Sequence, residues 1–212
     1  MIALSDADFF AIRGKDSDFL LSKGVEKYGD DYEESIEYYR LSAAMGNPQA
    51  ISNLGYCYLY GRSIEPNVSL ALAYFTIAAD FGVIDAFYKL GNIYSSDEFV
   101  DKDEELEKYY YEKAIDALLD SYADYEDYPS LSLAVAKETM EDGLFDTDLD
   151  RAYFLLKCAE NGFKKYIDNG DDFYEDHYTE TLDLLEDKQF DDEIKDNYNQ
   201  IYENEEDDVI WI

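Results

Sequence analysis

The sequence predicts an all-α protein, a solenoid of about four helix-turn-helix repeats with atypical capping helices at its ends. Residues 36–46 (IEYYRLSAAMG) and residues 72–82 (LAYFTIAADFG) match at an offset of 36 residues when their closing glycines are superimposed. The same offset relates residues 50–61 (AISNLGYCYLYG) to residues 86–97 (AFYKLGNIYSSD). Matched positions recur at helical spacing and do not alternate as in a strand. Self-similarity at this period is typical of a solenoid.

Composition indicates a folded, highly soluble and acidic chain. Its 212 residues include 51 acidic and 17 basic residues, for a formal net charge of −34. Such a charge is common in disordered chains, but 22 Tyr and 12 Phe argue for a packed core, because disordered segments are poor in aromatic residues. An acidic surface repels nucleic acids and anionic lipids, so we expect no direct nucleic-acid binding, no membrane binding and a basic protein partner.

The amino-terminal stretch and the cysteines predict a cytoplasmic protein. The stretch MIALSDADFFAIRG has no basic leader before an apolar run, so we expect no secretory signal. No apolar run approaches the roughly 20 residues needed to cross a bilayer. Cys57 and Cys158 lie far apart and outside any close pair that could hold zinc, and we expect two buried thiols in a reducing compartment.

The best-preserved repeat unit begins with a helix near residue 50. Ala50, Leu54 and Tyr58 are expected to form its buried stripe. Gly55 removes a side chain where we expect a second backbone to approach closely, and Gly61 is expected to end the helix.

The second helix of this unit follows Pro66 and Asn67, residue types that suit a helix start. Paired alanines at residues 78–79 allow close packing, and Gly82 closes the helix. We expect its apolar bulk to come from Tyr74, Phe75 and Ile77.

Two more units follow with lower fidelity. Around Ala114, LEKYYYEKAIDA fits the second-helix pattern, but Ala117 replaces the closing glycine, so the helix is expected to run on through LLDSY. A fourth unit reads LSLAVAKETMEDG and DRAYFLLKCAENG, with Lys137 in place of the packing glycine and Gly162 at the close. The insert SYADYEDYP before it is expected to stop at Pro129.

These units give a predicted organisation within one continuous structural domain. An amino-terminal capping region covers residues 1–30, with a degenerate first helix at residues 5–24, and repeats cover residues 31–162. Acidic capping helices and a tail cover residues 163–212, because terminal repeats of a solenoid are commonly atypical. Residues 167–212 alone hold 18 acidic and 2 basic residues.

The series of alanine, Leu-Gly, tyrosine and glycine, followed by an aromatic pair, Ala-Ala and glycine, resembles the Sel-1-like repeat, a relative of the tetratricopeptide repeat. The resemblance covers a little over half of the chain. It implies a right-handed superhelix of helix pairs and an adaptor or scaffold role, and by itself no chemistry. Some secreted relatives clamp each repeat with a disulfide, whereas Cys57 and Cys158 belong to different units, which argues against the secreted branch.

The resemblance also implies an inner surface, formed by first-helix residues that flank the packing glycine outside the buried stripe. A mixed aromatic and acidic lining suits a peptide that bears Lys or Arg, because tyrosine rings offer apolar area and cation–π faces. Alternatively, these tyrosines simply pack against neighbouring repeats. The expected binding residues are Gln49, Ser52, Tyr56, Tyr60, Asp85, Tyr88, Asn92, Ser96, Glu138 and Asp142.

Catalytic and metal sites are not expected. His177 is the only histidine and lies among carboxylates, as a surface histidine would. The stretch DTDLDRAYFLLK starts like a calcium loop, but Arg151 and Lys157 occupy its required glycine and glutamate positions, so helix capping explains it better. No glycine-rich phosphate loop, paired-cysteine motif or nucleophile elbow is present. We therefore expect a protein without enzymatic activity, cofactor or metal.

The closing VIWI segment, residues 209–212, holds the only tryptophan. It either tucks onto the last helix of the chain or inserts into a partner or a second copy. Tryptophan is enriched among interface hot spots, so Trp211 joins the candidate binding residues.

Two functions remain open. The first is a cytoplasmic adaptor that holds a basic or polar peptide in its inner groove; it predicts loss of binding on changes at Tyr56 or Tyr60, with modest salt dependence. The second is an acidic inhibitor or immunity protein that mimics nucleic acid or neutralises a basic toxin or nuclease; it predicts steep salt dependence. The sequence names neither the partner nor the oligomeric state.

Overall fold

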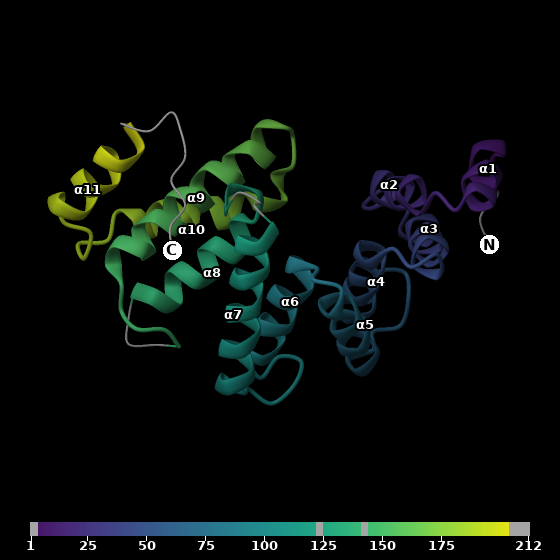
Figure 1. Ribbon diagram of the computed structural model, residues 1–212, viewed down its shortest axis with the longest axis horizontal. Coiled ribbons are helices and arrows are strands. Elements are labelled where there is room, and N and C mark those ends of the chain that lie inside the picture. The colour runs from purple at the N-terminus through teal and green to yellow at the C-terminus, as the bar shows by residue number, and fades with distance from the viewer. Residues whose placement is uncertain (1–3, 122–124, 141–143, 204–212) are drawn as a thin grey trace. The chain divides into compact units, whose positions relative to one another are not determined.

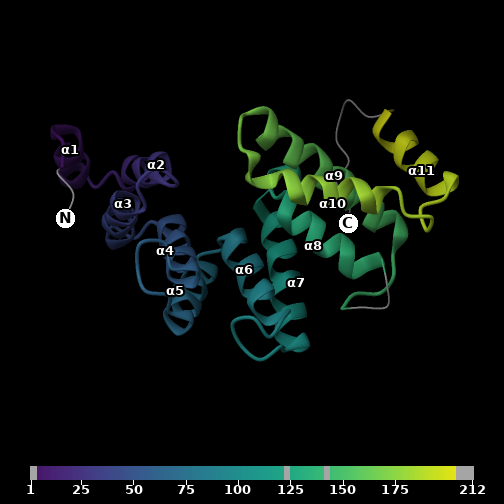
Figure 2. The ribbon, with the colours of Figure 1, turned by 180° about the vertical axis from the view of Figure 1, so that it is seen from behind.

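A computed structural model describes residues 4–121, 125–140 and 144–203, and within these every regular element is a helix. The prediction of an all-α chain is confirmed. The chain divides into two compact units, residues 1–117 and residues 118–212, which we describe separately (Figures 1 and 2).

Unit 1 is a succession of helices in which each packs against the next along the chain. Thus α2 contacts α3, α3 contacts α4, α4 contacts α5 and α5 contacts α6. This is the stacked arrangement that the 36-residue period predicts. The helices are α1 (Asp6–Gly14), α2 (Ser17–Lys27), α3 (Tyr32–Ala44), α4 (Pro48–Tyr60), α5 (Val68–Asp80), α6 (Ile84–Tyr94) and the larger part of α7 (Glu104–Ser121).

Polar side chains cap the starts of most of these helices. Asp16, Asp31, Asn47 and Asn67 each accept a hydrogen bond from the backbone N–H three residues on. These bonds satisfy amides that have no partner within the helix. The turns after α3, α4 and α5 contain glycines with positive φ at residues 46, 61 and 82, as the repeat pattern predicts.

Each helix pair of unit 1 packs an aromatic ring onto a glycine. A Cβ on Gly55 would lie 3.0 Å from ring atoms of Phe75, and one on Gly91 would lie 2.6 Å from ring atoms of Tyr111. Gly24 is covered by the ring of Tyr39 in the same way. The close approach expected at Gly55 is therefore made by a side chain, and the expectation of a second backbone there was wrong.

Two further expectations for unit 1 were wrong, and a third is confirmed. Ile77 does not fill the core, because it is 46% exposed, whereas Phe75 is fully buried. The single helix expected at residues 5–24 is broken into α1 and α2 at Lys15, whose φ is 58°. By contrast, α7 does run past Ala117 to Ser121, as predicted.

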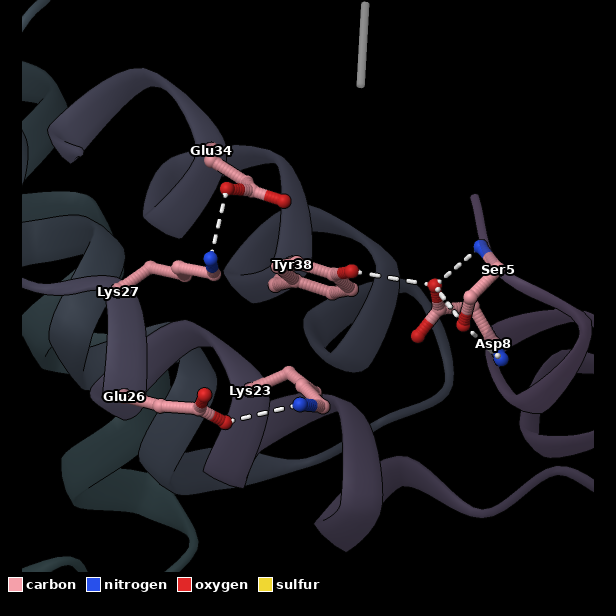
Figure 3. A network of polar contacts seen from close by, with 7 residues as sticks. All are labelled: Ser5, Asp8, Lys23, Glu26, Lys27, Glu34 and Tyr38. Carbon is pink, nitrogen blue, oxygen red and sulfur yellow. Dashed lines mark hydrogen bonds and ion pairs between the residues drawn. The ribbon is translucent and has the colours of Figure 1, made fainter. Parts of the chain in front are cut away.

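A buried carboxylate ties α1 to α3 (Figure 3). Asp8 Oδ2 accepts hydrogen bonds from the Ser5 N–H at 2.6 Å, the Ser5 hydroxyl at 2.7 Å and the Tyr38 hydroxyl at 3.1 Å. Burial alone would raise the pKa of Asp8, but these hydrogen bonds and the positive charge of Lys23 outweigh it, so the pKa lies below its usual value. The carboxylate is thus held ionised where α1 meets the first repeat.

Unit 2 is organised around α9, which packs against α8, α10 and α11 and against a 3₁₀ turn. Asp148 caps α9 by accepting a hydrogen bond from the Arg151 N–H at 3.0 Å, which confirms helix capping for this one of the alternating aspartates. The elements after α7 are η1 (Tyr125–Asp127), α8 (Pro129–Met140), α9 (Leu149–Asp168), η2 (Asp172–Tyr174), α10 (Glu175–Leu185) and α11 (Asp192–Glu203).

Gly162 does not close a helix, because α9 continues through it to Asp168. A Cβ at this position would collide with the backbone carbonyl of Glu126 and would lie 2.9 Å from Cβ of Pro129. The glycine therefore permits the chain around η1 to cross α9 closely, a contact that the repeat pattern does not contain.

Candidate functional site

The inner-surface prediction places its residues on the first helices of two successive pairs, and the structure brings α4 and α6 together there. Tyr56 and Tyr60 lie on α4, with ring centroids 4.5 Å apart. Tyr88 and Lys89 lie on α6, and the Lys89 Nζ atom is 5.3 Å from the ring centroid of Tyr56 and 5.1 Å from that of Tyr88. Lys89 therefore connects the tyrosines of two repeats.

Further rings extend this cluster beyond α4 and α6. The Tyr28 ring lies 6.2 Å from Tyr56 and 5.0 Å from Tyr32, and the Tyr60 ring lies 5.8 Å from Phe99. These contacts join residues near the ends of α2 and α6 to the first helices of the pairs. We call this set the tyrosine face; it consists of Tyr28, Tyr32, Tyr56, Tyr60, Tyr88 and Phe99.

Cations of the chain itself already lie over rings of the tyrosine face. Lys89 lies over Tyr56 and Tyr88, and the Arg62 guanidinium carbon is 5.4 Å from the ring centroid of Tyr32. The cation–π contacts that the sequence assigned to a Lys or Arg of the partner are thus made within the protein at three of these rings.

Lys89 and Asp85 lie one helical turn apart on α6 and are both closely surrounded by protein atoms. Asp85 is exposed, but partial desolvation raises the pKa of its carboxyl group above the usual value. The positive charge of Lys89 and a hydrogen bond from the Gln49 amide oppose this shift. Desolvation lowers the pKa of Lys89, and the Asp85 charge opposes that shift. Lys89, which is half-buried, is therefore the more poorly solvated of the two charges.

Hydrogen bonds fix other polar side chains beside the tyrosine face. The Tyr111 hydroxyl of α7 donates to Asn92 Oδ1 at 2.7 Å, and the Gln49 amide donates to Asn53 Oδ1 at 3.3 Å. Desolvation raises the pKa of Tyr60 to about 12, so its hydroxyl stays protonated and able to donate at neutral pH. The surface can thus offer donors, acceptors and aromatic area to a polar chain.

The structure does not place the remaining predicted site residues on the tyrosine face. Ser52 is only 4% exposed, so it is not available to a partner, and Ser96 lies after the end of α6. Glu138 belongs to α8 of unit 2, where its carboxylate accepts a hydrogen bond from the Leu144 N–H at 3.4 Å. Asp142 and Trp211, with the whole VIWI segment, lie outside the described residues.

Sequence reasoning missed four residues of this region. Tyr28, Tyr32 and Phe99 could not be predicted, because they lie at helix ends or in loops. There the repeat spacing does not show which way a side chain points. Lys89 could have been found, since it lies four residues after Asp85 and one after Tyr88 on the same stripe of α6.

Residues 4–121, 125–140 and 144–203 contain no group of His, Cys, Asp and Glu side chains that could hold a metal ion. None of their helices is long and apolar enough to cross a membrane. His177 is half-buried on α10, with its ring centroid 5.7 Å from that of Phe163 and 6.2 Å from that of Phe173. It therefore packs in an aromatic cluster, and the expectation of a plain surface histidine was wrong.

The helix pairs of unit 1 coincide with matches to a family model, the Sel1 repeat, over residues 19–47, 48–82 and 84–117. Three Sel1 repeats are thus matched within residues 19–117. Each match contains one helix pair, α2 with α3, α4 with α5 and α6 with α7, so the glycine–ring contacts and the tyrosine face belong to the Sel1 repeats.

Several known proteins are similar to this chain. Chitin synthase regulatory factor 3 of Schizosaccharomyces pombe is 29% identical over 73 residues, which are 34% of this chain and 8% of that protein. A Sel1 repeat protein from Oxalobacter formigenes is 29% identical over 50% of this chain and 84% of that chain, with a TM-score of 0.43. A protective antigen of uropathogenic Escherichia coli with an SLR fold is 14% identical over 92% of this chain and 58% of that chain, with a TM-score of 0.47. The chain thus spans a small fraction of the curated relative.

Proposed function

We propose that this protein is an adaptor that binds a polar peptide segment on the tyrosine face. Sel1 repeat proteins generally mediate protein–protein interactions. The observation that carries the proposal is the ring cluster itself, which joins residues of all three Sel1 repeats into one surface. Aromatic rings with polar tips suit peptide recognition, because they bury apolar area while their hydroxyls form hydrogen bonds.

The sequence alone favoured a basic peptide, and the cations on the tyrosine face weigh against that choice. A Lys or Arg of the partner would meet Lys89 at Tyr56 and Tyr88, and Arg62 at Tyr32. Like charges at such short range repel. We therefore favour a polar segment over a basic one, and we retain a cytoplasmic location, which the two buried cysteines, not joined in a disulfide, support.

The test is an affinity selection from a degenerate pool of synthetic octapeptides, with bound peptides identified by mass spectrometry. We expect the wild-type protein to enrich a defined set, and Tyr56→Ser together with Tyr60→Ser to lose it. Tyr109→Ser is the matched control, because Tyr109 is 49% exposed on α7 and is not part of the tyrosine face. Equal enrichment by the double variant and the wild type would contradict the proposal.

The competing function, an acidic inhibitor of a basic protein, is favoured by the charge of residues 167–212, with 18 acidic and 2 basic residues. Salt separates the two functions. Binding that depends on the tyrosine face should weaken only modestly as salt rises, whereas many simultaneous ion pairs would be screened together and binding would fall steeply.

A further inference from the structure

We propose that Lys89 binds a carboxylate of the peptide, from an Asp or Glu side chain or from the peptide's own terminus. The inference rests on the proposed peptide-binding function and names the chemical group that the tyrosine face recognises.

Lys89 makes no ion pair within the described residues, although the Asp85 carboxylate lies one turn away on α6. Within the described residues its ammonium forms no ion pair and donates no hydrogen bond, and its contacts are with the rings of Tyr56 and Tyr88. Several other lysines of unit 1 do form ion pairs: Lys23 pairs with Glu26 at 2.9 Å, Lys27 with Glu34 at 3.2 Å and Lys113 with Asp116 at 3.0 Å.

The position of Lys89 favours binding of a further hydrogen-bond acceptor to its ammonium group. An ammonium carries three donors, and ring faces attract its charge without replacing the strong hydrogen bonds that water or a carboxylate supplies. Lys89 is half-buried between two rings, and this desolvation lowers its pKa. A bound carboxylate would restore the lost solvation with a charge-assisted hydrogen bond.

The net charge of −34 opposes anionic ligands in general, but it does not exclude a single carboxylate. Exposed charges are screened over about 8 Å at physiological salt, so a single carboxylate at the tyrosine face is governed by its near neighbours. There Lys89 attracts it and Asp85, one turn away on α6, repels it. A single carboxylate is therefore acceptable at this site, whereas a polyanion is opposed by the whole surface.

The experiment uses the octapeptide pool in two forms, one with a free terminal carboxylate and one with a terminal amide. Enriched peptides are resynthesised with each Asp or Glu changed to Asn or Gln, and affinities are measured by fluorescence polarisation. We expect one of these neutralisations to weaken binding about 10- to 100-fold, the range for a hydrogen bond to a charged group. The change that does so identifies the source of the carboxylate.

Protein variants then assign the effect to Lys89. In Lys89→Met we expect the acidic and neutralised peptides to bind equally, while Asp85→Asn should tighten the acidic peptide severalfold. Lys113→Met is the matched control, because Lys113 also lies over a tyrosine ring, at 6.0 Å from Tyr109, but has its own carboxylate in Asp116. Lys113→Met should keep the full difference in affinity between the acidic and the neutralised peptides.

The outcomes separate this inference from the proposed function. Peptides that need Tyr56 and Tyr60 but lose less than about threefold on every neutralisation would overturn the carboxylate inference and leave the adaptor intact. If Lys89→Met still binds the acidic peptide more tightly than the neutralised one, the carboxylate inference is also overturned. If no peptide depends on Tyr56 and Tyr60, the proposed function fails and the inference with it.

Discussion

At the scale of single residues, unit 1 depends on contacts between a glycine of one helix and a ring of the next. The sequence predicts that these glycines matter, because Gly55 and Gly91 recur at the repeat period. It does not predict which side chain packs against them, because helical spacing shows which side of a helix is buried and not which residue of the next helix contacts it. The same limit explains why Lys89, in register with Asp85, was not expected between two tyrosine rings.

We predict that Gly91→Ala destabilises the protein by about 1–3 kcal/mol, the usual cost of overpacking. The new Cβ would lie 2.6 Å from the Tyr111 ring, whose far end is held by the hydrogen bond to Asn92. Urea unfolding followed by circular dichroism measures the loss. Gly14→Ala is the control, because a Cβ there meets nothing within 4 Å and should be neutral or slightly stabilising. Equal effects of the two changes would refute the packing role.

A second residue-scale prediction concerns Asp8. Tyr38→Phe removes one of its hydrogen bonds and should cost about 1–2 kcal/mol at pH 7. The folded-state pKa of Asp8 is lowered from 3.8, so its stabilising contribution is present above that value and is lost as pH falls through the folded-state pKa. The cost of Tyr38→Phe should therefore shrink near pH 3, as measured by urea unfolding at both pH values. A cost that is independent of pH would contradict this role.

At the scale of helices, the boundaries follow from capping residues that are visible in the sequence, and their tertiary contacts do not. Asn67 was predicted to start α5, and its side chain caps that helix. Gly162 was predicted to close a helix by analogy with Gly82, yet α9 runs through it. From the sequence alone, a glycine can mark either the end of a helix or a close contact between segments. The tertiary structure is needed to distinguish the two.

We predict that the cap at Asn47 contributes more than the cap at Asn67. Asn47 is buried; it accepts from the Ala50 N–H at 3.0 Å and donates to Asp18 Oδ1 of α2 at 2.8 Å. The side chain of exposed Asn67 accepts from the Leu70 N–H at 2.9 Å and forms no hydrogen bond with another helix in the described part of the chain. Replacement by Ala should cost about 2–3 kcal/mol at Asn47 and about 1 kcal/mol at Asn67, measured by urea unfolding. The opposite order would show that the contact with Asp18 adds nothing.

At the scale of the whole molecule, charge acts on stability as well as on partners. With 51 acidic and 17 basic residues, most carboxylates have no cation to pair with, and many of the ion pairs that form are exposed. Exposed pairs contribute little to stability, whereas the excess of like charge opposes the compact state. Composition predicts this balance directly, because it needs no knowledge of the fold.

Sodium chloride should therefore stabilise the protein. Raising it from about 0.02 M to about 0.5 M screens the repulsion while weakening only a few exposed ion pairs, so the urea midpoint should rise. The extrapolated free energy of unfolding should rise by more than its uncertainty of roughly 10–15%. A midpoint that falls with salt would mean that the ion pairs outweigh the repulsion.

The central claim is that the Sel1 repeats of residues 19–117 bind a peptide on the tyrosine face. The most direct measurement is the set of backbone amide chemical-shift changes in the full chain when a peptide from the selection is added. We predict that the largest changes fall on α4 and α6, around Tyr56, Tyr60, Tyr88 and Lys89. Changes confined to residues 118–212 would contradict the claim.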